Sequence, residues 1–261
     1  MQDAGTLLSL RGVNKTFGKV KVLHDIDLDI GTNEIVAIVG DNGAGKSTLI
    51  KIVTGVHRPT SGEVYFKGLP RTRYSVRDSR EMGIETVYQE RALADQQALW
   101  RNTFAGREIT RRLGFMDIGE QKRETDRLLR EHIGFTSAAI TSDSAVKGLS
   151  GGEKQGVAIG RALHFNANLI ILDEPTMGLS LNETARVLEF VKDIRRQGKS
   201  AIFIDHNIFH VYDVSDRFVI LDRGRIAGSF LKSELSQDEL VNKMLLLATT
   251  GSLETAEGVE A

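Results

Sequence analysis

A glycine-rich loop between an apolar run and a helix-forming run most constrains what this chain can fold into. Residues 34–40 read EIVAIVG, with no polar side chain from Ile35 to Val39. Such a continuous apolar run is typical of a strand that is covered on both faces, as in a parallel sheet flanked by helices. The loop GDNGAGKST follows at 40–48, and STLIKIVTG then predicts a helix that ends at Gly55. The order of strand, glycine loop and helix favours an α/β fold with a mainly parallel sheet.

The same loop predicts binding of a nucleoside triphosphate. It matches the pattern G-x-x-x-x-G-K-[ST]. Its glycines allow backbone N–H groups to turn toward phosphate oxygens, and the start of the helix adds the positive end of its dipole. Lys46 is placed to reach the β- and γ-phosphates, and the Ser47 hydroxyl to hold Mg²⁺. The residues expected to contact the nucleotide are Gly40, Asp41, Asn42, Gly43, Ala44, Gly45, Lys46, Ser47 and Thr48.

A second buried strand supplies two carboxylates. NLIILDE at 168–174 ends in Asp173, which is placed to bind Mg²⁺, and Glu174 follows it. A carboxylate one residue beyond the metal-binding aspartate can polarise a water in line with the γ-phosphate. Alone, this pair fits an acidic turn at a strand end. Together with the glycine loop it indicates Glu174 as the catalytic base.

The rest of the chain predicts one domain over residues 5–248. Two strand-like runs, at about Leu7–Leu10 and Ile26–Ile30, lie on either side of the turn-rich stretch 12–20. Ile26, Leu28 and Ile30 alternate with aspartates, as in a half-buried strand of an N-terminal antiparallel β subdomain. Residues 90–147 are rich in Arg, Glu, Gln and Ala and predict an inserted helical subdomain, at about 90–160, with a helix closed by Gly134. SQDE at 236–239 predicts the start of a last helix, and 249–261 a flexible acidic tail.

Composition excludes several classes of function. The net charge of −1 argues against nucleic acid as a partner. The absence of cysteine excludes disulfides, thiolate metal sites and a cysteine nucleophile. The longest apolar runs are far too short to span a membrane, and the first residues do not resemble a secretory signal. These features predict a cytosolic protein without a transmembrane segment of its own.

LSGGEKQ at 149–155 is a second glycine loop, about a hundred residues after the first. With it, the chain resembles the ATP-binding subunit of ABC transporters over residues 7–228, because LSGGE is similar to the signature of that family. Gln89 in TVYQE resembles the glutamine that senses Mg²⁺ and the membrane partner. His206 in FIDHN resembles the switch histidine at the γ-phosphate, and Phe17 the aromatic residue that stacks on adenine. The resemblance implies a P-loop NTPase fold of the RecA-like type, ATP and Mg²⁺ as cofactors, and ATP hydrolysis.

The resemblance also implies a role for the second loop. In the family, two cassettes face each other head to tail, and the signature of one covers the ATP on the P-loop of the other. Ser150, Gly151 and Gly152 are therefore expected to complete the γ-phosphate site of a second copy, which requires a homodimer. A serine hydroxyl, backbone amides and a helix N-terminus are suited to that task.

A narrower resemblance concerns the substrate. VYQE, AGREI at 105–109 and DHNIFHVYDVSDRFVILDRGRIAG are similar to the ATPases of simple-sugar importers, here with one cassette as in the fructose-importer type. This implies membrane permease subunits, a periplasmic or extracellular sugar-binding protein, and a peripheral position on the cytoplasmic face of the inner or plasma membrane. The matching residues do not specify the sugar.

Four positions depart from the family pattern. Ser180 stands where an aspartate is common in the loop after EPT, Met177 and Gly178 replace the usual small residues, and Glu153 ends the signature in place of glutamine. The first departure weakens the expected coupling between two sites. Alternatives are a soluble, non-transport ABC ATPase, an importer ATPase for another small solute, and a regulatory cassette that binds ATP without hydrolysing it. A P-loop kinase or GTPase leaves LSGGE unexplained.

Overall fold

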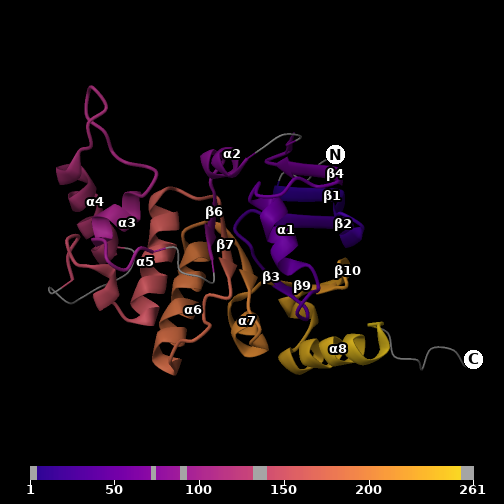
Figure 1. The fold of residues 1–261 in the computed structure, drawn as a ribbon. Coiled ribbons are helices and arrows are strands. Elements are labelled where there is room, and N and C mark those ends of the chain that lie inside the picture. The colour runs from indigo at the N-terminus through magenta and orange to yellow at the C-terminus, as the bar shows by residue number, and fades with distance from the viewer. Residues whose placement is uncertain (1–4, 72–74, 89–92, 132–139, 254–261) are drawn as a thin grey trace, which may run out of the picture.

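The computed structural model describes residues 5–71, 75–88, 93–131 and 140–253, which form two sheets and eight α-helices (Figure 1). The strands are β1 (Thr6–Phe17), β2 (Val20–Gly31), β3 (Ile35–Val39), β4 (Ser61–Phe66), β5 (Leu69–Pro70), β6 (Ile84–Val87), β7 (Leu169–Asp173), β8 (Ser200–Ile204), β9 (Arg217–Asp222) and β10 (Arg225–Leu231). The α-helices are α1 (Lys46–Val53), α2 (Val76–Glu81), α3 (Leu99–Phe104), α4 (Ile118–Glu131), α5 (Gly151–His164), α6 (Leu181–Arg196), α7 (Ile208–Val214) and α8 (Gln237–Thr250).

The larger sheet has six strands in the order β10-β9-β3-β8-β7-β6. The five strands from β9 to β6 run parallel, and β10 pairs antiparallel with β9. Every residue of β3 and β8 is buried, since helices and the second sheet cover the two faces. The predicted α/β class with a mainly parallel sheet is confirmed.

The smaller sheet is antiparallel, in the order β2-β1-β4-β5. Its β1 is longer than the sequence indicates, because the stretch expected to be rich in turns continues the strand to Phe17. Register shifts between Leu10 and Val13, and again before Thr16, absorb the irregular sequence, so that only Gly18 and Lys19 connect β1 to β2. The pattern of turn residues therefore marks bulges here and not the end of the strand.

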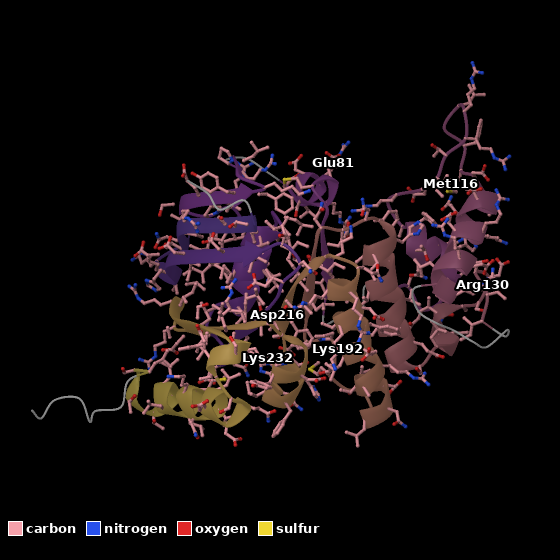
Figure 2. The ribbon with its side chains drawn as sticks, turned by 180° about the vertical axis from the view of Figure 1, so that it is seen from behind. Glu81, Met116, Arg130, Lys192, Asp216 and Lys232 are labelled. Carbon is pink, nitrogen blue, oxygen red and sulfur yellow. The ribbon has the colours of Figure 1, made fainter. Side chains whose placement is uncertain are left out.

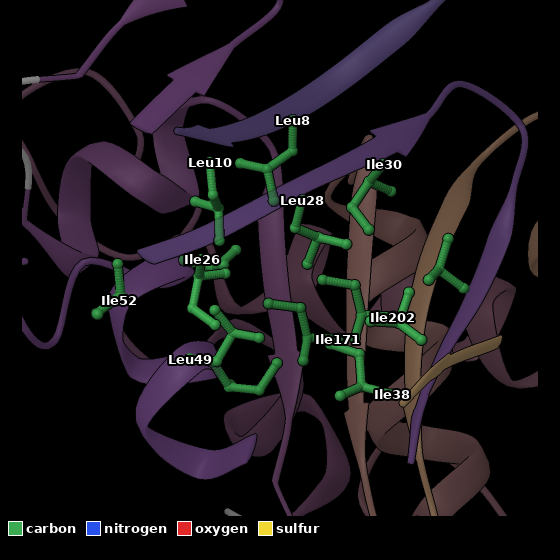
Figure 3. Packing of buried hydrophobic residues seen from close by; sticks show 14 of the residues in the cluster. Leu8, Leu10, Ile26, Leu28, Ile30, Ile38, Leu49, Ile52, Ile171 and Ile202 are labelled. Atoms are coloured by element: carbon green, nitrogen blue, oxygen red, sulfur yellow. The ribbon is translucent and has the colours of Figure 1, made fainter. Parts of the chain in front are cut away.

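The main core lies between the two sheets and includes α1. Leucines and isoleucines of β1 and β2 face those of the parallel sheet, and α1 contributes its apolar side (Figure 3). The fully buried members in this view include Leu8, Leu10, Ile26, Ile30, Ile38, Leu49, Ile171 and Ile202. This packing fixes α1, and with it the glycine loop, against the end of β3.

The other face of the parallel sheet is covered by α5, α6, α7 and α8. Leu188, Val191 and Ile194 form the predicted buried stripe of α6. Helix α8 starts at the predicted capping box, in which the Ser236 hydroxyl accepts from the backbone N–H of Glu239. It continues to Thr250, past the point where the sequence indicates a tail, because Gly251 provides a left-handed C-cap.

The helical lobe has a small core of its own. Leu99 of α3, Leu128 and Leu129 of α4, and Val157 of α5 meet there. The predicted end of its long helix at Gly134 lies outside the described residues. A hairpin projects from the lobe between α3 and α4, with Met116 at its base (Figure 2). The Nε–H of Arg111 donates to the carboxylate of Asp117 at 2.7 Å across the base of this hairpin. This hydrogen bond holds the pKa of Asp117 at about 2.

Candidate active site

The glycine loop connects β3 to α1 in a geometry that only glycine allows at two positions. Gly40 has φ 153°, and a Cβ there would lie 2.1 Å from the carbonyl oxygen of Leu221. Gly45, with φ 107°, would place a Cβ 2.8 Å from Leu23. The loop encloses a cavity of about 210 Å³ at the start of α1, next to exposed Ser47. Its lining residues are Val22, Asp41, Asn42, Gly43, Gly45, Lys46, Ser47, Thr48 and Glu174.

Lys46 folds over this loop. Its Nζ donates to the carbonyl oxygens of Gly40 (2.5 Å) and Asp41 (3.0 Å), and the residue is only 8% exposed. Burial lowers the pKa of Lys46, and the nearby charges of Glu174, Asp41 and Asp173 oppose that shift. Among the described residues this buried ammonium donates to carbonyl oxygens, and a phosphate oxygen is a stronger partner for it, since ionic hydrogen bonds are stronger.

Two carboxylates face this lysine from the end of β7. Burial and the neighbouring charge of Glu174 raise the pKa of Asp173. The hydroxyl of Ser47 and the carboxylate of Asp173 are the kinds of donor that Mg²⁺ takes in phosphate sites, where nucleotide oxygens and waters complete the shell. Gln89, the third predicted metal ligand, lies outside the described residues. A cluster of three or more His, Asp or Glu side chains suited to a metal is absent from the part of the chain that the structure describes.

Glu174 and His206 contact each other. The Nε2 atom of His206 lies 2.7 Å from the Oε1 atom of Glu174, with the histidine side chain half exposed and the glutamate side chain 15% exposed. Glu174 takes a left-handed backbone (φ 50°), and its N–H donates to the carbonyl of Ile204 at 2.8 Å. The structure therefore brings Lys46, Glu174 and His206 to one edge of the sheet. This is the arrangement expected for a base, its orienting partner and a phosphate-binding cation.

Three polar residues that sequence reasoning missed, Thr176, Asp205 and His210, connect the segment after Glu174 to the segment that carries His206. The Thr176 hydroxyl donates to the buried carboxylate of Asp205 and lies 3.1 Å from Nδ1 of His210. Asp205 also accepts from the backbone N–H of Asn207 at 2.9 Å. This network fixes the segment that carries His206 against the one that carries Glu174. The signal was available, because Asp205 directly follows an apolar strand, much as Asp173 ends one.

The second glycine loop forms the start of α5. Ser150 is the N-cap, and its hydroxyl accepts from the N–H of Glu153, whose carboxylate accepts from the N–H of Ser150 at 2.8 Å. The N–H of Gly152 donates to Oε1 of Glu183 at 3.0 Å. Ser150, Gly151 and Gly152 do not line the cavity at the P-loop of the same chain. The structure therefore does not bring the two glycine loops together within one chain.

Phe17 lies at the end of β1 with 43% of its surface exposed. Its ring centroid is 5.1 Å from that of His57 in an edge-on contact, and Nζ of Lys15 lies 4.9 Å from the ring. A partly exposed aromatic ring can stack on a base.

A second hollow, of about 530 Å³, lies at the opposite edge of the sheet. It is larger than the cavity at the P-loop, but four of its charged side chains already pair with one another. Lys192 contacts Asp213 at 2.9 Å, and Arg195 contacts Asp216 at 2.7 Å. Chemistry, and not volume, therefore identifies the cavity at the P-loop as the candidate active site.

Comparison with known proteins decides the family. The model of the family described as "ABC transporter" matches residues 23–177. The xylose/arabinose import ATP-binding protein XylG of Sulfolobus acidocaldarius is 40% identical over 93% of this chain and 95% of its own length. The chain belongs to the ABC transporter family. It is an ATPase of that family, and the predicted resemblance to sugar-import cassettes is confirmed.

Further relatives agree. The fructose import ATP-binding protein FrcA of Rhizobium meliloti is 41% identical over 84% of this chain and 86% of its own length. The chain spans about half of the ribose import relatives, for example 47% of RbsA from Caldanaerobacter subterraneus. The fold matches the post-hydrolysis dimer of the ATP-binding cassette MJ0796 bound to ADP and Pi, with a TM-score of 0.73 and 24% identity, over 87% of this chain and 99% of that one.

None of the helices in the described ranges combines the length and the apolarity that a membrane crossing needs.

Proposed function

We propose that this ABC ATPase is the ATP-hydrolysing subunit of an importer for a simple sugar and works as a head-to-tail homodimer on the cytoplasmic face of the membrane. Residues 5–248 form its ATPase domain, with the helical subdomain at about 90–160. The observation that carries the proposal is the separation of two phosphate-binding loops within one chain. Each is chemically suited to the same nucleotide, and the cavity at the P-loop is lined without the signature residues. The relatives named for xylose/arabinose and fructose import support the substrate class.

In this proposal the P-loop holds the nucleotide and the end of β7 activates water. Backbone amides at the start of α1 and the ammonium of Lys46 bind the phosphates, and Phe17 stacks on adenine. When Mg²⁺ is bound, by Ser47, Asp173 and Gln89, it neutralises charge on the phosphate oxygens. Glu174 accepts a proton from the attacking water, and His206, 2.7 Å away, orients Glu174 and reaches the γ-phosphate.

The second chain completes the site. Ser150, Gly151 and Gly152 of that chain supply a hydroxyl and amides at a helix start to the γ-phosphate. Closure then depends on ATP, and hydrolysis releases it. The exposed apolar side chains of Met177 and Leu181, at 55% and 89%, flank the loop after EPT and are suited to burial between two chains.

The helical lobe is the proposed contact to the permease. Its projecting hairpin exposes three large apolar side chains, Leu113 (88%), Phe115 (72%) and Met116 (50%). Clustered exposed apolar residues mark interaction sites. Replacement of Leu113 and Phe115 by serine is therefore expected to reduce sugar uptake more than tenfold and to leave the ATPase activity of the isolated cassette unchanged. Uptake at the wild-type rate would remove the hairpin from the permease contact.

Reconstitution tests the whole proposal. The ATPase, co-expressed with a candidate sugar permease from the same organism, is expected to co-purify with that permease in detergent. In proteoliposomes containing the sugar-binding protein, xylose, arabinose, ribose or fructose should accumulate only with ATP. Turnover that no sugar stimulates, with another small solute accumulating instead, would correct the substrate class. ATPase that never co-purifies with a membrane protein would favour a soluble, non-transport ABC protein.

A further inference from the structure

The start of the signature helix α5 already carries an anion, supplied by the chain itself. Oε1 of Glu183 accepts from the N–H of Gly152 at 3.0 Å. Oε2 of the same carboxylate accepts from the N–H of Ser180 at 3.0 Å and from its hydroxyl at 2.8 Å. The side chain of Glu183 thus connects the signature to the loop after EPT. Glu183 and Gly152 are 31 positions apart in the sequence.

The approach of the two helices makes this contact specific. A Cβ at Gly152 would lie 2.8 Å from Cβ of Glu183, so that only glycine allows α6 to start so close to α5. Hydrogen bonds from Gly152, from Ser180 and from the Ser150 hydroxyl hold the pKa of Glu183 at about 2. The carboxylate is therefore ionised at every pH at which the protein works, and it draws on two of the donors that the proposed function gives to the γ-phosphate.

We propose that Glu183 is an internal competitor of the γ-phosphate at the signature, and that the partner's ATP must displace it before the dimer closes. This inference rests on the proposed function, because it needs the signature to act in trans. A carboxylate and a phosphate cannot share the N–H of Gly152, and their like charges repel each other at this distance. Glu183 thus raises the ATP concentration needed for closure.

Ser180 fits the same device. A serine at the N-cap of α6 donates its hydroxyl to Glu183, whereas an aspartate there would place a second carboxylate beside it. The departure from the family pattern at residue 180 is thereby explained by its partner at residue 183. When ATP displaces the Glu183 carboxylate from the signature, the carboxylate stays bound to Ser180. Each closing event therefore changes the contacts of the loop after EPT, which faces the second chain.

The test measures ATP-dependent dimerisation in a chain that does not turn over. Glu174→Gln is expected to dimerise with ATP, and sedimentation velocity gives the ATP concentration at half-maximal dimer. Adding Glu183→Gln should lower that midpoint about fivefold, the effect of one charge at a helix N-terminus. Glutamine keeps an acceptor oxygen for the capping box but loses the charge at the start of the helix, so that the melting temperature should fall slightly while the midpoint for dimerisation also falls.

Two matched variants separate this effect from loss of a cap or of a charge. Glu239→Gln makes the equivalent change in the Ser-Glu capping box at the start of α8, far from the signature, and should leave the midpoint unchanged. Glu153→Gln removes one charge from the start of α5 but leaves Glu183 on Gly152, and should shift the midpoint less than twofold. Glu183→Asp keeps the charge on a shorter side chain, and the box of Ser75 with Asp78 shows that aspartate can cap a helix in this chain. It should also lower the midpoint.

A midpoint that stays the same or rises in Glu183→Gln overturns the inference while the proposed function stands. A shift as large in Glu153→Gln as in Glu183→Gln overturns it as well, because a general field and not the contact with Gly152 would then act. Failure of Glu174→Gln to dimerise with ATP at any concentration defeats the proposed function in trans, and the inference with it.

Discussion

The two glycine loops of this chain offer a phosphate the same chemistry in two different states. At the start of α1 the amides face a cavity of about 210 Å³, Ser47 is exposed, and Lys46 donates to two carbonyl oxygens of its own loop. At the start of α5 the side chain of Glu183 already occupies the N–H of Gly152. The first loop is open to a ligand, and the second is occupied by its own chain. Under the proposed function, this difference makes nucleotide binding the first step and closure onto the signature a separate step with its own cost.

The largest effect is expected from a change that stops hydrolysis at the P-loop site and leaves the signature loop intact. Glu174→Gln should reduce hydrolysis about 10²–10⁴-fold, because glutamine cannot accept the proton of the attacking water. ATP binding should persist, since the P-loop amides and Lys46 are untouched. Turnover by phosphate release and binding of a fluorescent ATP analogue measure the two effects. Hydrolysis within threefold of wild type would exclude Glu174 as the base.

The second effect in size tests whether the two loops of one site come from different chains. Lys46→Ala disables the P-loop of its own chain, and Ser150→Arg fills the phosphate-facing side of its own signature. Each variant alone has two defective sites per dimer. In an equal mixture about half of the dimers are mixed, and each of these holds one intact site, so activity should return to about a quarter of wild type if the sites act independently.

The mixture needs two controls. Mixed dimers must be shown to form, for example by pull-down through a tag on one variant, and a dimer with one wild-type chain must be active. If mixed dimers form and no activity returns, the signature does not act in trans. Recovery well below a quarter would instead measure the coupling between the two sites.

The open loop was predictable from sequence because it is local. Strand, glycine loop and helix follow one another within residues 35–53, and each signal stands in the right order. The parallel sheet followed from the apolar runs for the same reason. The length of β1 was missed, since bulges that continue a strand use the same residues as turns that end one.

The state of the second loop was not predictable in this way. Sequence identified Ser150 and Gly152, but their contact with Glu183 joins two helix starts separated in the chain and depends on how α5 and α6 pack. Ser180 was read only as a missing aspartate, whereas the structure shows it as the N-cap of α6. Thr176 and His210 were overlooked because a lone polar residue carries no signal until its partner is known. The role of Gln89 stays a prediction.

The smallest effect sharpens the comparison at Ser180. In Ser180→Asp the hydroxyl that donates to Glu183 at 2.8 Å is replaced by a carboxylate, which repels it. Aspartate caps a helix about as well as serine, so the free energy of unfolding should change by less than about 1 kcal/mol. Glu183 should loosen from Gly152, and in the Glu174→Gln background the ATP midpoint for dimerisation should fall about two- to threefold.

The double variant decides how this change works. If Ser180→Asp acts only through Glu183, combining it with Glu183→Gln should give no further fall in the midpoint, because the two changes share one contact. The family resemblance predicts a different result, in which aspartate at this position strengthens coupling and raises the Hill coefficient for ATP in the assembled transporter. A raised Hill coefficient with an unchanged midpoint would show that the aspartate acts across the dimer and not through Glu183. If Ser180→Asp lowers the midpoint alone but adds nothing in the presence of Glu183→Gln, residue 180 acts within its own chain, through the contact of Glu183 with the signature.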